Sequence, residues 1–384
     1  MTAIACIEDL RKKAERRVPR MFYDYADGGS WSESTYRANE NDFQAINFRQ
    51  RVAVDVSHRD TTMEMLGKTV TMPVALAPTG LTGMLHADGE ILAAKAAANF
   101  GVPFTLSTMS ICSIEDVSAN SDAPFWFQLY VMRDRDFMRR LIERARTANC
   151  SALMITLDLQ IMGQRHKDLR NGLSAPPKPT LRNLMNLLRK PAWCLGMLGT
   201  KRRQFGNIVG HVKGVKDMSS LADWTVSQFD ASLSWNDVKE IRKQWDGKLI
   251  IKGILDAEDA RAAVNVGADA IVVSNHGGRQ LDGALSAITA LPAIVDAVGE
   301  KAEVWMDSGI RSGQDVLRAI ALGAQGTLIG RAFLYGLGAN GQAGVTQALE
   351  IIHKELDLTM GLCGRSELRK VDQSILSQSV SDRW

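Results

Sequence analysis

The stretch LIIKGILDAEDARAAVNVGADAIVVS, residues 249–274, decides the fold. It opens with a short apolar run at Leu249–Lys252, continues with helical period over Asp256–Val266, and ends with a second apolar run at Ala270–Ser274. Gly267 stands where the helix should stop, because glycine readily adopts the left-handed conformation that ends many helices. A buried strand, a helix and a second buried strand form one unit of a parallel α/β sheet.

The same unit recurs along most of the chain. Segments of helical period follow most of the apolar runs, as at Asp88–Phe100, Arg133–Ala148 and Gly313–Leu322. Eight strands that alternate with helices favour closure into a (β/α)8 TIM barrel over an open sheet. The predicted strands are Pro73–Ala77, Phe104–Ser107, Phe125–Leu129, Leu153–Asp158, Leu249–Lys252, Ala270–Ser274, Val304–Asp307 and Thr327–Ile329.

Two regions fall outside this rhythm. Residues 1–72 precede the first strand and are expected to form an N-terminal helical cap, and residues 159–248 make a long insertion after strand four. Within the insertion, residues 174–216 hold nine Lys or Arg and no Asp or Glu, with leucines interleaved, which predicts a basic amphipathic insert. Because TIM barrels carry insertions of this size, we interpret residues 1–384 as a single barrel domain.

Composition excludes several classes of protein. The net charge of +3 gives no global signal for nucleic acid. The five cysteines are scattered without metal-type spacing, which favours free thiols in a reducing compartment and predicts no metal site. No run of 18 apolar residues exists, and the N-terminus lacks the apolar core of a signal peptide. We therefore expect a cytoplasmic protein.

The ends of the predicted strands are polar in nearly every case. In a TIM barrel these C-terminal ends line the active site. One buried Ser or Thr at a strand end is usually structural, but seven such ends together predict a pocket for a flat heteroaromatic ring. The residues concerned are Ser107, Gln128, Tyr130, Thr156, Asp158, Lys252, Ser274, His276, Asp307, Gly330 and Arg331.

The segment SNHGGRQLD, residues 274–282, is the strongest local signal. Its two glycines permit a tight turn that directs His276 and Arg279 toward one pocket. A histidine accepts protons near neutral pH, and an arginine can bind both oxygens of a carboxylate. A lone histidine is more often structural, but this context favours a catalytic base.

The last two strands predict a phosphate site. Asp307-Ser-Gly-Ile-Arg311 follows strand seven and Gly330-Arg331 follows strand eight, and barrels frequently bind phosphate in these two loops. The motif Gly336-Leu-Gly-Ala-Asn-Gly341 has GxGxxG spacing but does not open a strand–turn–helix unit, so we do not interpret it as a dinucleotide site.

These features together resemble the FMN-dependent α-hydroxy acid dehydrogenase and oxidase family, which includes glycolate oxidase, lactate oxidase, L-lactate dehydrogenase and mandelate dehydrogenase. The resemblance covers essentially the whole chain. The matching segments are Phe22–Gly29, Ala77–Gly80, Thr105–Ser107, Phe127–Tyr130, Thr156–Asp158, Lys252-Gly253, Ser274–Asp282, Asp307–Arg311 and Gly330-Arg331.

The resemblance implies FMN-dependent oxidation of a small L-2-hydroxy acid, with L-lactate to pyruvate favoured. It implies that His276 is the base, supported by Asp158, and that Arg165 and Arg279 bind the substrate carboxylate with help from Tyr25, while Tyr130 contacts the substrate oxygen. For the cofactor it implies contacts from Ala77, Pro78, Thr79, Ser107, Gln128, Thr156, Lys252, Ser274, Asp307, Gly309, Arg311, Gly330 and Arg331.

Some positions refine this expectation. The family often has Arg-Glu where this chain has Arg165-His166, and Met109 stands where glycolate oxidases carry Trp. Gly80, where oxidases typically have Ala, favours a dehydrogenase. Residues 174–216 resemble the membrane-binding insert of bacterial lactate and mandelate dehydrogenases, which implies a protein held on the inner face of the cell membrane, with quinone as a candidate acceptor. The family is commonly tetrameric, which implies a homotetramer.

Alternatives remain open at this point. The enzyme could be an oxidase that uses oxygen, or a mandelate dehydrogenase, and the insert could be a solvated loop or an oligomer contact. A different class of enzyme, a barrel lyase or isomerase, would use Lys252 as a Schiff base and the phosphate site for its substrate. A non-catalytic flavin-binding or membrane-interaction protein would need neither His276 nor its partner Asp158.

Overall fold

A parallel sheet closed into a barrel forms the centre of the molecule. The computed structural model describes residues 3–173, 181–212, 224 and 227–377. Each strand pairs with its sequence neighbour, β3 pairs with β10, and a parallel bridge between Leu76 and Phe104 joins β3 to β4. The predicted α/β barrel and all eight predicted strands are therefore confirmed. The strands are β3 (Val74–Leu76), β4 (Thr105–Ser107), β5 (Trp126–Tyr130), β6 (Ala152–Thr156), β7 (Lys248–Ile254), β8 (Ala270–Val273), β9 (Glu303–Met306) and β10 (Gly326–Ile329).

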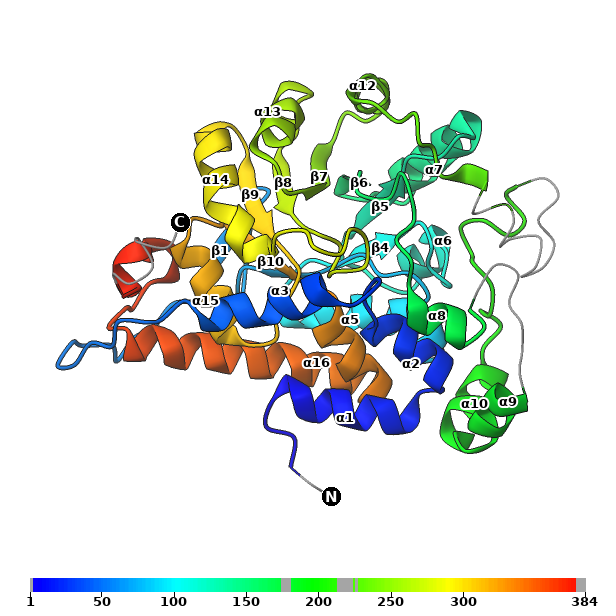
Figure 1. Ribbon diagram of the computed structural model, residues 1–384, viewed down its shortest axis with the longest axis horizontal. Coiled ribbons are helices and arrows are strands. Elements are labelled where there is room, and N and C mark those ends of the chain that lie inside the picture. The colour runs from blue at the N-terminus through cyan, green and yellow to red at the C-terminus, as the bar shows by residue number, and fades with distance from the viewer. Residues whose placement is uncertain (1–2, 174–180, 213–223, 225–226, 378–384) are drawn as a thin grey trace.

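Helices surround the barrel (Figure 1). Their apolar stripes face the sheet, as in α7, where Phe137, Leu141 and Ile142 are buried. The helices are α4 (Thr82–Leu85), α5 (Gly89–Phe100), α6 (Ile114–Ser118), α7 (Arg135–Thr147), α12 (Trp235–Lys243), α13 (Ala257–Asn265), α14 (Ala287–Val298), α15 (Gly313–Ala321) and α16 (Arg331–Leu362), with 3-10 turns η1 (Gly299–Lys301), η2 (Leu368–Lys370) and η3 (Gln373–Ile375).

The barrel interior changes from apolar to polar along the strands. Side chains alternate between the two faces of a strand, so every second residue points inward. In the lower part these residues form one apolar cluster, within which the rings of Trp126 and Trp305 stack 5.2 Å apart. Two residues further along the same strands stand Gln128 and Asp307. The period of the strands therefore places the predicted polar residues directly above an apolar floor.

A hairpin closes the N-terminal end of the barrel. Strands β1 (Met63–Met65) and β2 (Lys68–Val70) are antiparallel, and Met65 and Val70 belong to the same inner cluster as Trp305. Leu66 and Gly67 turn the chain with φ values of +52° and +74°, as a tight two-residue hairpin turn requires. For residues 1–72 we expected only a helical cap, and the hairpin was not predicted.

The remaining N-terminal residues form the cap. Helices α1 (Ile7–Arg17), α2 (Arg20–Asp27) and α3 (Ser34–Gln44) lie across the barrel, and α1 packs along α16 (Figure 1). Asp27 fastens this contact, because its carboxylate accepts hydrogen bonds from Arg11, at 2.9 and 3.2 Å, and from Tyr335, at 2.6 Å. The cap is thereby held on the C-terminal helix of the barrel.

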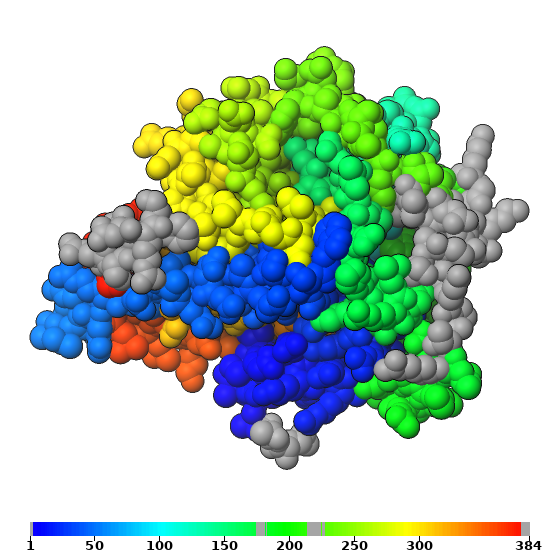
Figure 2. All heavy atoms as spheres, viewed as in Figure 1, coloured from blue at the N-terminus to red at the C-terminus, as the bar shows by residue number. Residues whose placement is uncertain are grey.

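The insertion after β6 contains α8 (His166–Arg170), α9 (Leu181–Leu188) and α10 (Pro191–Gly199), which precede α12. Figure 2 shows this segment in green beside the blue cap. Trp193 of α10 stacks on Phe22 of α2 at 5.5 Å, and its indole nitrogen donates to the carbonyl of Met84 at 2.8 Å. Parts of the predicted insert, residues 174–180 and 213–216, lie outside the described residues. No described helix is both long and apolar enough to cross a bilayer.

The GxGxxG motif lies inside α16, which is interrupted at Asn340 and Gly341. A Cβ on Gly336 would meet the Gly344 carbonyl oxygen at 2.2 Å, and one on Gly338 would meet Val18 at 2.8 Å. These glycines therefore allow close packing between helical segments. Packing of this kind explains the glycine spacing without a dinucleotide site.

Candidate active site

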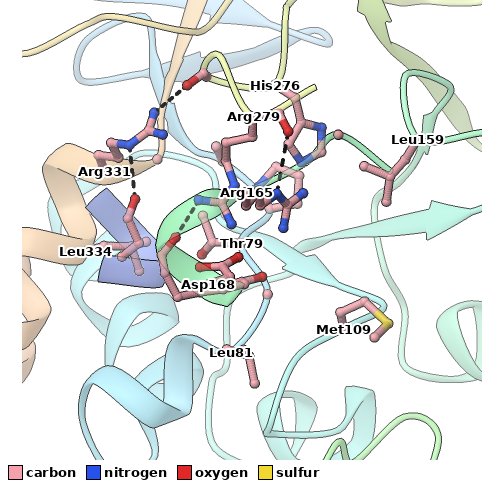
Figure 3. Close-up of a pocket in the computed structure, with 18 of the residues that line it drawn as sticks. Thr79, Leu81, Met109, Leu159, Arg165, Asp168, His276, Arg279, Arg331 and Leu334 are labelled. Atoms are coloured by element: carbon pink, nitrogen blue, oxygen red, sulfur yellow. Dashed lines mark hydrogen bonds between the residues drawn. The ribbon is translucent and has the colours of Figure 1, made fainter. Parts of the chain in front are cut away.

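A cavity of about 760 Å³ opens at the C-terminal ends of the strands. Its wall comes from the cap, from the loops after β3, β4, β6, β8 and β9, and from the start of α16 (Figure 3). The predicted site residues that line it are Tyr25, Ala77, Pro78, Thr79, Tyr130, Arg165, Lys252, His276, Arg279, Asp307, Gly309, Arg311, Gly330 and Arg331.

His276, which lines this cavity, forms a dyad with Asp158. The Nδ1 atom of His276 lies 2.9 Å from Oδ1 of Asp158, and the side chains are 18% and 11% exposed. Burial would raise the pKa of Asp158, but the charge and hydrogen bond of His276 outweigh burial and hold that pKa below its usual range. The ionised carboxylate must accept, so Nδ1 donates and Nε2 keeps its lone pair.

Burial has the opposite consequence for the imidazole. It lowers the pKa of His276 below the ordinary value, although the neighbouring Asp158 raises it. At neutral pH the ring is therefore neutral and can accept a proton, while Asp158 stands ready to stabilise the cation that results.

The loop that carries His276 is held in an uncommon conformation. His276, Gly277 and Gly278 all have positive φ, at 58°, 67° and 69°. A Cβ on Gly278 would meet the backbone nitrogen of Tyr36 at 2.5 Å, so only glycine fits there. The tight turn predicted for the two glycines is present.

A reciprocal pair of amides fixes this loop to the cap. The side chain of Asn39, on α3, donates to Asn275 at 2.8 Å, and Asn275 donates back to Asn39 at 2.7 Å. Asn275 also accepts from the backbone of Gly278 at 3.0 Å and donates to that of Leu285 at 3.0 Å. Both amides are buried, so the pair is a satisfied polar network that specifies the position of the His276 loop.

Two guanidinium groups flank the dyad. Arg279 lies 4.6 Å above the ring of Tyr25, and its Nη1 donates to the carbonyls of Tyr25 and Gly28. Its Nη2 is buried and has no hydrogen-bond partner among the residues that the structure describes. Within the described part of the chain, the side chain of Arg165 donates one long bond, of 3.5 Å, to the Arg279 carbonyl. Donors of this kind, aimed into a cavity and not yet satisfied, suit a carboxylate ligand.

One amide group and one hydroxyl group at the mouth of the barrel also lack hydrogen-bond partners among the described residues. The Oε1 atom of Gln128 accepts from Ser107 at 3.1 Å and from the backbone of Thr108 at 3.3 Å, which fixes the amide orientation. Its Nε2 is then left buried with no partner in the described residues, and the same holds for Oγ1 of Thr156. Because buried polar groups are nearly always hydrogen-bonded, these atoms point to a polar ligand that completes the site.

Lys252 is buried between two partners. Its Nζ atom lies 2.8 Å from Asp307 and 2.7 Å from Ser274, and its side chain is 4% exposed. Ser274 also accepts from the backbone nitrogen of His276 at 3.1 Å. The cation is thereby held at the cavity wall by an ion pair and does not lie free as a nucleophile.

The phosphate end of the cavity is built from the last two loops. A Cβ on Gly309 would lie 1.9 Å from the carbonyl oxygen of Asn39, so the loop can approach α3 only as glycine. Arg311 pairs with Glu40 at 2.9 Å. Arg331 donates to the carbonyls of Ala26, Gly277 and Gly28 at 3.0, 2.9 and 2.8 Å. Arg331 thus joins the cap to the His276 loop, a role that its position after β10 did not predict.

Several lining residues were missed by the sequence analysis. Asp168 of α8 and the apolar residues Leu159 and Met162 face the cavity, as does Phe229. They belong to the insertion. Site residues were predicted from their distance to a strand end, and most of the insertion lies far from any predicted strand. Asp168 follows Arg165 by three positions, which on a helix places both on one face, and that spacing could have found it.

The cavity fits the cofactor that the sequence implied. Unsatisfied polar atoms at the strand ends suit the edge of a heteroaromatic ring, and the loops after β9 and β10 provide a glycine, backbone amides and two arginines for a phosphate. Among the described residues, no group of three His, Cys, Asp or Glu could hold a metal ion. The fold and the site together define a barrel enzyme that uses a phosphorylated aromatic cofactor.

Comparison with known proteins agrees. A family model described as FMN-dependent dehydrogenase matches residues 14–378. The chain is 48% identical to L-lactate dehydrogenase of Caulobacter vibrioides (strain NA1000 / CB15N), over 98% of both chains, and 48% identical to that of Ectopseudomonas mendocina (strain ymp), over 97% of this chain and 98% of the relative.

Among solved structures, a monotopic membrane protein, (S)-mandelate dehydrogenase, superposes with a TM-score of 0.93 at 36% identity, covering 98% of this chain and 100% of that one. A mandelate oxidase superposes with a TM-score of 0.81 at 36% identity, covering 95% and 96%. The chain belongs to the FMN-dependent dehydrogenase family, and FMN is its cofactor.

Proposed function

We propose that this enzyme oxidises L-lactate to pyruvate. One observation carries the proposal: a neutral, buried imidazole, held by Asp158, shares a cavity with Arg279, whose Nη2 lacks a partner. A base beside a carboxylate-binding group is what a 2-hydroxy acid requires. The relatives from C. vibrioides and E. mendocina, both named L-lactate dehydrogenase, favour lactate over mandelate.

Substrate binding begins with the carboxylate. Arg279 offers its free Nη2, and Arg165 approaches from the start of α8. Tyr25 lies under Arg279 and contributes its ring to the same subsite, while Tyr130 lines the cavity nearby. Burial raises the pKa of Tyr130, so its hydroxyl stays protonated and can donate to the substrate oxygen. Fixing the carboxylate in this way orients the reacting carbon. Such positioning can lower the activation barrier by up to about 7 to 11 kcal/mol.

The proton then moves to His276. Its Nε2 is the free acceptor, and Asp158 stabilises the imidazolium as it forms. Whether the hydroxyl proton or the Cα proton is taken, the same nitrogen accepts it. FMN, when bound, supplies the acceptor for the two electrons of the substrate.

The chain's own residues hold that cofactor. We assign the edge of the flavin ring to Gln128 and Thr156, with Ser107 fixing the amide of Gln128. We assign further flavin contacts to Ala77, Pro78 and Thr79 in the loop after β3. Lys252, positioned by Asp307 and Ser274, would place a positive charge beside the bound flavin and would stabilise negative charge on its ring. Gly309, Arg311, Gly330 and Arg331 form the phosphate end.

The test is anaerobic reduction of the bound flavin by a panel of hydroxy acids. We expect L-lactate to bleach the absorbance near 450 nm faster than L-mandelate or glycolate, and D-lactate to leave it unchanged. Reoxidation with a quinone and with air then identifies the acceptor. Faster bleaching by L-mandelate would replace the proposed substrate, and failure of every L-2-hydroxy acid would overturn the proposed activity.

We further propose that α9 and α10 hold the enzyme on an anionic membrane surface. Leu181, Leu184, Leu188, Leu195 and Leu198 are 74%, 55%, 74%, 69% and 70% exposed. A cluster of exposed leucines on two adjacent helices is unusual for a soluble surface and marks an interaction site. The neighbouring Arg189 and Lys201 add positive charge, worth about 1 kcal/mol each near anionic lipid. The (S)-mandelate dehydrogenase that superposes on this chain is described as monotopic.

This placement suggests the acceptor and the location. Trp193 of α10 contacts Phe22 and Met84, and both of these line the cavity. The proposed membrane helices thus adjoin the cavity wall, which favours a lipid-soluble quinone as electron acceptor and the inner face of the cell membrane as location.

We also propose that the enzyme forms a homotetramer, as is common in the family. Sedimentation equilibrium would test this oligomeric state.

Vesicle binding tests the membrane proposal. Replacing Leu184, Leu188, Leu195 and Leu198 with Gln should abolish cosedimentation with phosphatidylglycerol vesicles and leave reduction of a water-soluble dye intact. Replacing Leu358 and Leu362, which are 50% and 61% exposed on α16, is the matched control and should change neither. Undiminished cosedimentation of the α9–α10 variant would refute the assignment.

A further inference from the structure

Asp168 is the acidic residue of the cavity that the proposed reaction does not use. It lies on the short helix α8, three residues after Arg165, and faces the cavity with Arg165 and Arg279. Figure 3 shows it below these two arginines in the view. A charged carboxylate in the chamber that receives the substrate carboxylate needs an explanation, because like charges in a poorly solvated site repel strongly.

The carboxylate does not hold the arginines by direct contact. Within the part of the chain that the structure describes, no hydrogen bond or ion pair within 4.0 Å links Asp168 to Arg165 or Arg279, whose donors go instead to backbone carbonyls. The positions of the guanidinium groups therefore depend on the Arg279 loop and the cap. Any influence of Asp168 on the two guanidinium groups must therefore come from its charge and not from a direct contact.

The surrounding charges give that carboxylate a defined balance. Burial raises the pKa of Asp168, and the charges of Arg279 and Arg165 oppose that rise. Asp24 on α2 raises the same pKa, whereas Lys167 on α8 lowers it. Arg165 and Arg279 thus carry two positive charges against the single carboxylate of Asp168, which leaves one positive charge of this group for a ligand to balance.

We propose that Asp168 determines specificity, by restricting the chamber to ligands with a single carboxylate. A monocarboxylate completes the charge balance of Arg165 and Arg279. A second carboxylate on the ligand would add another negative charge beside Asp168. The cavity wall there includes the apolar residues Leu81, Met109 and Leu159, and the lining Arg203 donates to the carbonyls of Thr200 and Leu198. This inference rests on the proposed function, because it takes Arg165 and Arg279 as the carboxylate site.

Propionate and malonate are the probes that separate charge from size. They differ by the exchange of a methyl group for a carboxylate, and neither can be oxidised as a 2-hydroxy acid. Their Kd values are measured by perturbation of the flavin spectrum of the oxidised holoenzyme. We expect the wild type to bind propionate and to bind malonate at least tenfold more weakly.

Substitution then assigns the discrimination to Asp168. Asp168→Asn should tighten propionate several-fold and malonate by more than tenfold, so that the difference between the two shrinks. Asp168→Glu should keep the discrimination. Asp24→Asn is the matched control, since Asp24 bears on the same electrostatic balance but does not line the cavity. Asp168→Ser, which is also neutral, replaces Asp168→Asn if that variant does not retain FMN.

The outcomes distinguish this inference from the proposed function. Equal tightening of both probes, unchanged Kd values, or weaker binding in the neutral variants would each overturn the role of Asp168. If propionate does not bind the wild type and L-lactate does not bleach its flavin, the proposed function itself fails. Wild-type binding with no response to Asp168→Asn would remove only the specificity role.

Discussion

The two ends of the barrel use the same strands for different purposes. At the N-terminal end the inward residues are apolar, Trp126 and Trp305 stack, and a hairpin closes the opening. At the C-terminal end the same strands present Gln128 and Asp307, and the loops leave a cavity of about 760 Å³. The difference teaches that stability and chemistry are separated along the strand axis, so a substitution should damage one property or the other according to its height in the barrel.

The largest expected effect is on catalysis at the C-terminal end. His276→Gln removes the proton acceptor but keeps a polar side chain of similar size, so turnover should fall by about 10⁴-fold, the upper range for general-base catalysis. Because the floor of the barrel is untouched, flavin content and the melting temperature should stay close to those of the wild type. Stopped-flow reduction of the flavin by L-lactate measures the loss. A variant with wild-type reduction rate would exclude His276 as the base.

The opposite pattern is expected at the N-terminal end. Trp305 is fully buried, so Trp305→Ala leaves a cavity and should cost about 3 to 5 kcal/mol of unfolding free energy. Denaturant unfolding measures this cost, and kcat of the folded fraction should change less than threefold. Trp305→Phe, which retains most of the apolar volume, is the control and should lose less stability. A large fall in kcat with unchanged stability would contradict the separation of the two ends.

The strand pattern explains why so much of the barrel could be predicted. Buried parallel strands are continuous apolar runs, as at Ala270–Val273, and each run ends at a polar residue that the period places inward. The strand pattern placed His276 and Asp158 beyond the ends of β8 and β6, two strands that β7 separates, and the family resemblance implied the contact between them. Local sequence was sufficient to predict which side chains at the strand ends face the barrel interior, because the alternation of side chains along a strand is a local property.

Contacts between distant segments could not be predicted in the same way. The pair Asn39–Asn275 joins residues 236 positions apart, and nothing in the sequence around Asn39 marks it. Arg331 also donates to the carbonyls of Ala26, Gly277 and Gly28, and its place after strand eight gave no sign of these three bonds. The hairpin at Leu66-Gly67 was missed because its strands have only three residues each. Such features depend on how the cap docks, which periodicity does not encode.

A smaller effect, on the pH profile, should follow from Asp158→Asn. Burial lowers the pKa of His276 and Asp158 raises it, so the substitution should lower that pKa further. Activity requires the neutral imidazole, so kcat/KM falls as the pH drops through this pKa, and the acid limb should move to lower pH in the variant. The rate at neutral pH should fall by about 10²-fold or more, because the imidazolium loses its support. An acid limb that moved to higher pH would contradict the assigned coupling.

The smallest effect tests whether the cap belongs to the catalytic end of the barrel. Asn39→Ala leaves the buried amide of Asn275 without its partner, which should cost about 1 to 3 kcal/mol of stability. Because Asn275 precedes His276 in a loop with positive φ, the base should lose its fixed position, and kcat should fall about tenfold with little change in KM. Asn39→Asp keeps an acceptor for Asn275 and should recover part of the rate. Thr35→Ala, another buried substitution on α3 whose bonds reach Leu281 and Ala284, is the control for general loosening of the cap. If both alanine variants lower the stability but only Asn39→Ala lowers kcat, then the cap positions the base through this one amide pair. An equal loss of kcat in the two would instead make α3 a purely structural cover.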